Sequence, residues 1–129
     1  MTEVQTGIVP GDNEIGLGNF QDTPLVRRVV DLTGRPHNVL VLGKVVIRND
    51  DGDAQNAAVR LTANDTATEI DRVDIRIPAG QFGVAVSVMG WITAPDIIGD
   101  RPIIDIRAST FRGVAQHARL TVTVVDTLT

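Results

Sequence analysis

The sequence predicts an all-β protein, folded as an antiparallel two-sheet β-sandwich. First, apolar and polar residues alternate along several short segments, as they do in strands with one dry and one solvated face. Second, turn-forming residues separate these segments, and no window shows helical spacing with a proper cap. Third, the chain has one Trp, three Phe and no Tyr, so Val, Ile and Leu must fill the core. These branched residues pack well on a pleated sheet.

Length and composition set the domain organisation. The chain has 129 residues, 43% of them apolar, and fits a single domain with a sizeable core. Residues 25–129 are expected to form the sandwich. Residues 1–24, rich in Gly, Asp and Asn, are expected to form an extended N-terminal arm. This arm is either a frayed terminus or a segment that docks on a neighbouring subunit or another protein.

The expected strands follow one another between turn signals. The best-marked pair alternates apolar and polar residues on both sides of a Pro-Ala-Gly-Gln break at 78–81, where Pro and Gly suit the second and fourth places of a turn. Each strand of this pair buries one face only, which requires a second sheet. The complete set of expected strands is 25–32, 39–48, 57–63, 73–77, 82–88, 104–108 and 118–124.

Segment 39–48 is apolar on both faces. Its odd-numbered positions form an apolar core face, with a glycine at 43. On the opposite face Leu40, Leu42 and Val46 are apolar as well, and Lys44 is the charged exception. A strand that is dry on both sides is covered either by its own chain or by another molecule. In a domain of this size we favour a subunit contact. The predicted interface residues are Leu40, Leu42, Val46, Met89 and Trp91.

The charge and the cysteine content limit the kinds of molecules and metals that the chain can bind. The net charge is −4 and the only basic doublet is Arg27-Arg28, so the sequence offers no concentrated positive patch for nucleic acid. The chain has no cysteine, which excludes disulfides and thiolate metal sites. Its first residues lack the basic start followed by an apolar block that marks a secretory signal, and no apolar run is long enough for a membrane helix. We expect a virion or cytoplasmic protein, or a chain that begins after a cleaved leader.

Candidate metal ligands are sparse. His37 and His117 stand apart, with no His-x-His pair and no nearby Glu, and are interpreted as surface or interface side chains. Segment 49–53, Asn-Asp-Asp-Gly-Asp, offers oxygens to calcium but lacks the acidic spacing and final Glu of a calcium loop. Asp-Gly is also a common turn pair, and the turn is the favoured interpretation. The sequence predicts no metal and no cofactor.

No catalytic signature stands out either. Ser87 and Ser109 are the only serines, and neither lies in the G-x-S-x-G elbow of a nucleophile. Alternating Asp and Arg residues at 71–76 and 105–107 are interpreted as a solvated face with cross-strand pairs. No glycine-rich loop precedes a helix, as a phosphate site would require. The chain is therefore predicted not to be an enzyme.

Three segments together resemble a known family. They are NVLVLGKVVIRND at 38–50, RIPAGQFGVAVSVMGW at 76–91 and the closing RLTVTVV at 119–125. This pattern resembles the compact jelly roll of the tumour necrosis factor and complement globular-head type, over residue 25 to the C-terminus. The resemblance implies a jelly roll rather than an immunoglobulin-like Greek key. It also implies a homotrimer in which each subunit buries an apolar strand face.

Two functions follow as expectations. Similar small jelly-roll chains occur as decoration, fibre or tail components of bacteriophage particles, which favours a self-associating, homotrimeric virion component. The alternative is a carbohydrate- or receptor-binding module. In that module Trp91 and the loops at 49–53 and 93–100 would form the site, because a Trp at a strand end can stack on a sugar or anchor an interface. Sugar sites usually have further aromatic and amide groups around such a Trp, and this chain has few of them, so a core or interface position is favoured for Trp91.

Overall fold

A computed structural model describes residues 2–8, 14–31, 37–66, 68–80, 83–92 and 101–126, with the backbone alone for 2–8, 37, 125 and 126. These residues form strands and no helix, so none of them belongs to a helix that could cross a membrane. The strands are β1 (Thr2–Ile8), β2 (Ile15–Gly18), β3 (Thr23–Val29), β4 (His37–Asn49), β5 (Gln55–Ala63), β6 (Thr68–Ile77), β7 (Gly83–Ile92), β8 (Ile103–Thr110) and β9 (Arg112–Asp126).

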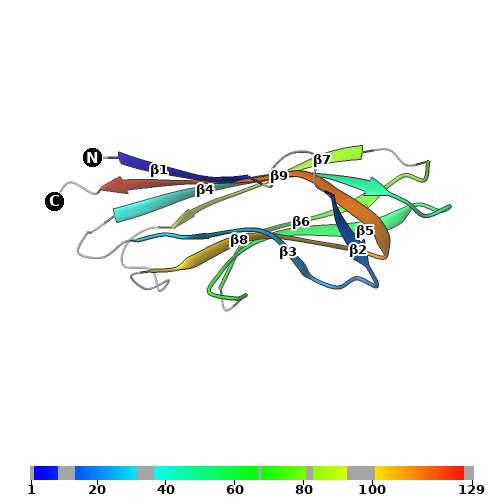
Figure 1. The fold of residues 1–129 in the computed structure, drawn as a ribbon, viewed down its shortest axis with the longest axis horizontal. Helices are drawn as coiled ribbons and strands as arrows, with labels where there is room; N and C mark the ends of the chain where they lie inside the picture. The colour runs from blue at the N-terminus through cyan, green and yellow to red at the C-terminus, as the bar shows by residue number, and fades with distance from the viewer. Residues whose placement is uncertain are drawn as a thin grey trace.

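The strands form two antiparallel sheets that pack face to face (Figure 1). One sheet has the order β1-β9-β4-β7, with β2 also paired to β9, and the other has the order β3-β8-β5-β6. Because β1 pairs with the second half of β9 and β2 with its first half, the two act as one interrupted edge strand. The chain thus pairs its first strand with its last, then β3 with β8, β4 with β7 and β5 with β6. This nested order is a jelly roll, as predicted.

The core lies between the two sheets and is built from the inward side chains of alternating residues. Fully buried members from both sheets include Val45, Ile47, Leu61, Ile106 and Leu120. Gly43 marks the tightest point of this packing. A Cβ added there would stand 3.0 Å from side-chain carbons of Ile106, Leu61 and Val88, so the two sheets approach closely because this position has no side chain.

All seven predicted strands are present, as β3 to β9. The N-terminal segment differs from the expected arm: β1 and β2 both pair with β9 of the same chain, and β3 already begins at Thr23. Leu17, one of the isolated apolar residues of this segment, is buried against the core. The difference arises because an edge strand is held by backbone hydrogen bonds, which any sequence can form without an apolar alternation.

Candidate functional site: an apolar sheet face

The five predicted interface residues lie together on the outer surface of the β4–β7 pair. Leu40 stands opposite Trp91 in the strand register, and Leu42 stands opposite Met89. Met89 is 63% exposed, Trp91 51% and Leu42 40%, while Leu40 and Val46 are half-buried. Their neighbours in sequence point the other way, into the core. We call the surface formed by Leu40, Leu42, Val46, Met89 and Trp91 the apolar face.

A polar border adjoins the apolar face along β4 and β9. Lys44 lies opposite Arg119 on one side and Ser87 on the other. Both cations are exposed, and neither forms an ion pair with another residue in the part of the chain that the structure describes. A shallow hollow of about 600 Å³ lies here, with Leu42 and Met89 among its lining residues. The surface therefore changes from apolar to cationic within a few residues of each strand.

The free edge of β7 is closed by β6 of the opposite sheet. The carboxylate of Asp71 accepts a hydrogen bond from the backbone N–H of Met89 at 2.9 Å. Next to it, Ile70 packs so tightly on Gly90 that a Cβ at this glycine would overlap its methyl group. An unpaired strand edge invites pairing with another chain, and these two contacts cover the edge of β7 at Met89 and Gly90.

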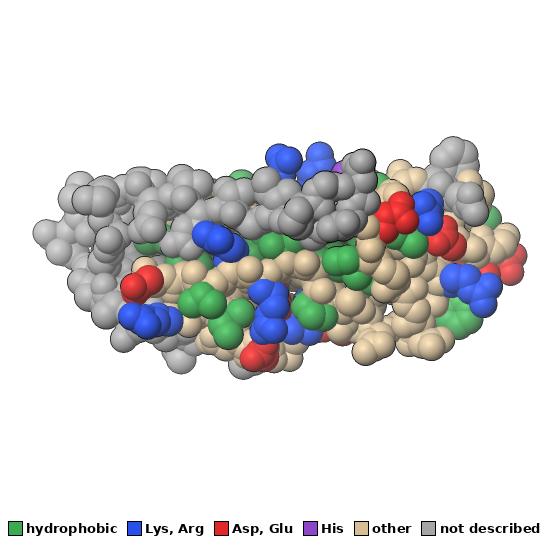
Figure 2. All heavy atoms as spheres, in the orientation of Figure 1, with side chains coloured by type: hydrophobic (Ala, Val, Ile, Leu, Met, Phe, Trp, Pro, Cys, Tyr) green, Lys and Arg blue, Asp and Glu red, His purple; other side chains and the backbone are tan. Residues whose placement is uncertain are grey.

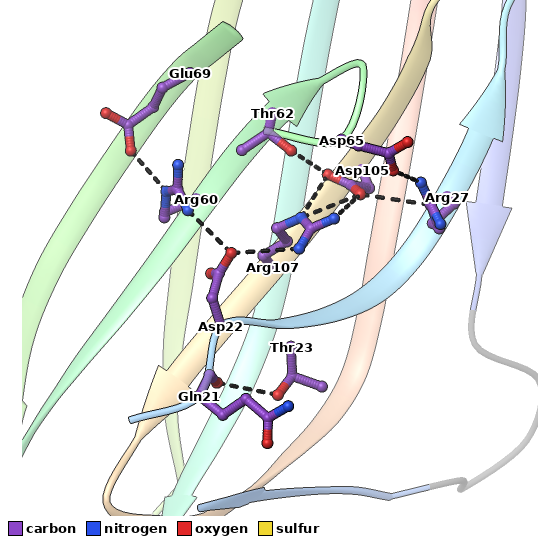
Figure 3. A network of polar contacts seen from close by, with 10 residues as sticks. All are labelled: Gln21, Asp22, Thr23, Arg27, Arg60, Thr62, Asp65, Glu69, Asp105 and Arg107. Atoms are coloured by element: carbon purple, nitrogen blue, oxygen red, sulfur yellow. Dashed lines mark hydrogen bonds and ion pairs between the residues drawn. The ribbon is translucent and has the colours of Figure 1, made fainter. Parts of the chain in front are cut away.

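The outer surface of the other sheet is charged instead of apolar (Figure 3). Arg60 lies 2.8 Å from the carboxylate of Glu69 and 3.0 Å from that of Asp22, and Asp22 is also 3.3 Å from Arg107. Figure 2, in which both sheets are seen from the side, shows Lys and Arg side chains beside Asp and Glu side chains at several places, with hydrophobic side chains between them. Arg60, Arg107 and the carboxylates around them therefore find partners within their own subunit.

The charged chain continues to Asp105, which is buried although it points away from the core. Arg107 lies 3.1 Å from its carboxylate and Arg27 3.5 Å, and the Thr62 hydroxyl donates a hydrogen bond to it. Arg27 continues the chain to the exposed carboxylate of Asp65. The sequence predicted a solvated Asp105. This was wrong, because Arg107 on the same strand and Arg27 on the neighbouring strand extend over it.

The pKa of Arg107 reflects this environment. Burial acts to lower it, but the hydrogen bond to Asp105 and the negative charges of Asp105 and Asp22 raise it more, so the net shift is upward. The pKa of a guanidinium is already far above neutrality, and a further rise keeps Arg107 charged over the whole range in which proteins are studied. The network is thus held by a permanent cation.

The loop at 49–53 is organised around a buried amide. The Asn49 amide nitrogen lies 2.9 Å, 3.1 Å and 3.1 Å from the carbonyl oxygens of Asp53, Ile77 and Pro78, which share its two N–H donors. Its oxygen accepts one from the Asp51 N–H at 2.7 Å and another from the Gln55 side chain. This loop is therefore a structural turn, and no group of three or more possible metal ligands occurs among the described residues.

The remaining predicted candidates are scattered. His117 is exposed on β9, at a bulge where its φ is 54°. The side chain of His37 and the loop at 93–100 lie outside the described residues. Ser87 borders the apolar face, whereas Ser109 lies on the other sheet. The structure does not bring these groups together.

One aromatic pair was missed by sequence reasoning. Phe20 and Phe111 lie in contact near the end of the sandwich that carries the β2–β3 turn, with ring centroids 6.0 Å apart, and both are exposed. Phe20 is an isolated apolar residue in a glycine-rich segment, and its neighbour in space is 91 positions away. The only local signal for the pair is Asn19, a residue that tolerates the left-handed backbone of a tight turn.

Comparison with known proteins finds likeness in fold alone. No protein-family model matches the chain, and no curated protein matches it in sequence. The fold is similar to VP2 of infectious bursal disease virus in a subviral particle, with a TM-score of 0.64 and 12% identity over 96% of this chain and 33% of that chain. For the viral particle of the same virus the TM-score is 0.65 and the identity 13%, over 96% of this chain and 31% of that chain. For the Gx strain of the virus the TM-score is 0.66 and the identity 14%, over 95% of this chain and 33% of that chain.

The chain thus spans about a third of the length of these viral chains. The likeness confirms the jelly-roll class that the sequence predicted. The closer resemblance to the tumour necrosis factor and complement globular-head type stays a prediction.

Proposed function

We propose that this chain is a non-enzymatic structural protein of a virus or bacteriophage particle, and that copies of it associate through the apolar face. The observation that carries the proposal is the set of exposed side chains Leu42, Met89 and Trp91, which the register of β4 and β7 places together with Leu40 on the outside of the sheet. Large apolar and aromatic side chains that cluster on a surface are typical of protein interfaces, and Trp is enriched among the residues that contribute most to binding.

The contrast between the two outer surfaces supports this choice of face. On the sheet β3-β8-β5-β6 a chain of ion pairs joins Glu69, Arg60, Asp22 and Arg107, and Asp105 is buried beneath Arg107 and Arg27. Such a surface is satisfied by water and by its own partners. On the sheet β1-β9-β4-β7, Trp91 and Met89 are exposed to water. Their burial would lower the free energy, and another molecule must cover them for this to happen.

The homotrimer is the favoured state because it is the assembly implied by the jelly-roll class that the sequence resembles. A ring of three copies joins two different patches of each subunit, one of which would be the apolar face. Lys44 and Arg119 at its border form no ion pair with a described residue, and they suit a neighbouring patch that carries acidic side chains. A ring can place a different, acidic patch against these cations. A twofold dimer centred on this border would instead bring Lys44 and Arg119 of one subunit close to the same cations of the other subunit.

The virion setting is supported by the fold likeness to chains of infectious bursal disease virus. Those chains are about three times as long, so the place of this protein in a particle is our inference. A decoration, fibre or tail component fits a single small sandwich that self-associates.

Light scattering coupled to size-exclusion chromatography tests the proposal. We expect the wild-type chain to form a trimer at micromolar concentration, and Leu42→Asp to form a monomer with an unchanged circular dichroism spectrum. Val29→Asp is the matched control, because Val29 is 61% exposed but lies on the other sheet. This variant should remain a trimer. A monomeric wild type, or unfolding by Leu42→Asp, would contradict the proposal.

A further inference from the structure

A tight turn between β2 and β3 holds an aromatic ring at the surface. The Gln21 N–H donates a hydrogen bond to the Gly18 carbonyl at 3.0 Å, and the two central residues, Asn19 and Phe20, have φ values of 55° and 56°. Two positive φ values in succession define a type I′ turn, in which the second central position favours glycine. Phe20 occupies that position and is 56% exposed.

The turn is fixed in place by the corner between β8 and β9. The Asn19 N–H donates to the Phe111 carbonyl at 2.9 Å, and the Phe20 N–H donates to the Thr110 carbonyl at 3.1 Å. The Phe111 ring supports one side of the Phe20 ring. The fold thus keeps a bulky aromatic side chain in a left-handed conformation, which costs free energy, and leaves much of the ring uncovered.

A hollow of about 640 Å³ lies beside Phe20 on the outer surface of β5, β6 and β8. Its volume is in the range of small-molecule sites, roughly 300–1,000 Å³. Ala58 lies between Ser109 on one side and Asp74 on the other in the strand register, and its short side chain leaves room between them. One exposed ring therefore adjoins a recess whose walls carry a hydroxyl and a carboxylate.

The charged groups in the hollow are unequally satisfied. Arg72 pairs with Asp74 at 3.1 Å. Arg76 donates a hydrogen bond to the Asn56 side chain at 3.1 Å but has no carboxylate partner in the described part of the chain. A guanidinium binds a carboxylate with two parallel hydrogen bonds, which is one of the stronger polar contacts available to a protein.

We infer that this hollow binds a saccharide that carries a carboxylate, such as a uronic or sialic acid. The Phe20 ring packs on the C–H face of the sugar, and Arg76 pairs with its carboxylate. Asn56, Ser109 and Asp74 exchange hydrogen bonds with its hydroxyl groups. A nucleotide suits the hollow less well, because its phosphates carry more negative charge and Asp74 lies among the lining groups. The site lies on the sheet opposite the apolar face and does not depend on self-association.

NMR titration of the full chain with glucuronic acid, N-acetylneuraminic acid and glucose tests this inference. We expect saturable shifts of the amide signals of residues 19–21, 56, 76 and 109 with at least one acidic sugar, and binding at least about tenfold weaker for glucose. Arg76→Gln should remove this difference, because its amide still contacts Asn56 but lacks the charge. Phe20→Gly should weaken binding of the acidic sugar about tenfold.

Phe20→Gly is suited to this test because glycine is the residue that the turn prefers, so the variant should fold at least as well as the wild type. Trp91→Ala, on the apolar face, should leave sugar binding unchanged. The inference is overturned if none of the three sugars gives saturable shifts, if glucose binds as well as the acids, or if Phe20→Gly binds like the wild type. It is also overturned if Trp91→Ala abolishes binding.

Discussion

Asp71 accepts a hydrogen bond from the backbone N–H of Met89 at 2.9 Å, and this contact joins the edges of the two sheets. It satisfies a donor that would otherwise face outward from the end strand β7. We expect Asp71→Ala to lower the free energy of unfolding by about 1 kcal/mol and to increase aggregation, because a strand edge is opened. Thermal melting with light scattering measures both effects.

Asp71→Asn is the control for this contact, because the amide keeps an oxygen that can accept the same hydrogen bond. It should aggregate less than Asp71→Ala. Equal aggregation of the two variants would show that the closure of β7 does not depend on this acceptor.

Asp105 is the centre of the charged network, and its loss should cost more than that of its exposed neighbours. Asp105→Ala leaves Arg107, whose side chain is 12% exposed, without its nearest carboxylate. Asp22 remains 3.3 Å from Arg107, so the cation keeps one partner, and the loss should be about 1.5–3 kcal/mol, as for hydrogen bonds to charged groups. Asp65→Ala, at the exposed end of the network, should cost less than about 1 kcal/mol. Urea unfolding of both variants measures the difference, and similar losses would contradict a buried role for Asp105.

His117 has a φ of 54° at the β9 bulge, a conformation that a residue with a side chain adopts at a cost. We expect His117→Gly to leave the free energy of unfolding unchanged or to raise it by up to about 1 kcal/mol. Arg119→Gly, two residues along the same strand, should instead lower it by roughly 0.5–1 kcal/mol. Denaturant titration tests the pair. A loss of stability in His117→Gly equal to that in Arg119→Gly would contradict a strained bulge.

Gly113 lies opposite Asn49 in the register of β9 and β4, and an added Cβ would overlap the backbone carbonyl of Arg48. Backbone of a central strand cannot move aside as a flexible side chain can. Gly113→Ala should therefore lower the unfolding free energy by about 1–3 kcal/mol or more. Gly52→Ala is the control, because nothing lies within 4 Å of its added Cβ. Calorimetry should show a clear fall in melting temperature for Gly113→Ala only.

The alternation of apolar and polar residues in the sequence was enough to predict both the sandwich and the apolar face. Strands β3 to β9 were predictable because each carries an apolar alternation that only a second sheet can bury. The apolar face was predictable because Leu40 and Leu42 fall on the side of β4 opposite to its core residues. Their pairing with Trp91 and Met89 depends on strand register, which the structure supplies.

Other features of the structure could not be predicted from the sequence, for physical reasons. Strands β1 and β2 are held by backbone bonds to β9 and have little alternation of their own. The burial of Asp105 depends on two arginines, one next to it on its own strand and one on a neighbouring strand, that fold over it. The turn at Phe20 has no recognised turn pair, since Asn-Phe stands where Asn-Gly would be expected. Each of these features depends on contacts between distant parts of the chain.

Trp91 is the only tryptophan of the chain, and it reports directly on the apolar face. Its fluorescence, measured with iodide as a quencher over a dilution series, tests whether another copy covers this surface. We predict a blue-shifted emission that is protected from iodide at micromolar concentration, and a red-shifted, readily quenched emission on dilution or in Leu42→Asp. A red-shifted and fully quenched emission at every concentration would contradict the proposal that the apolar face is an interface between subunits.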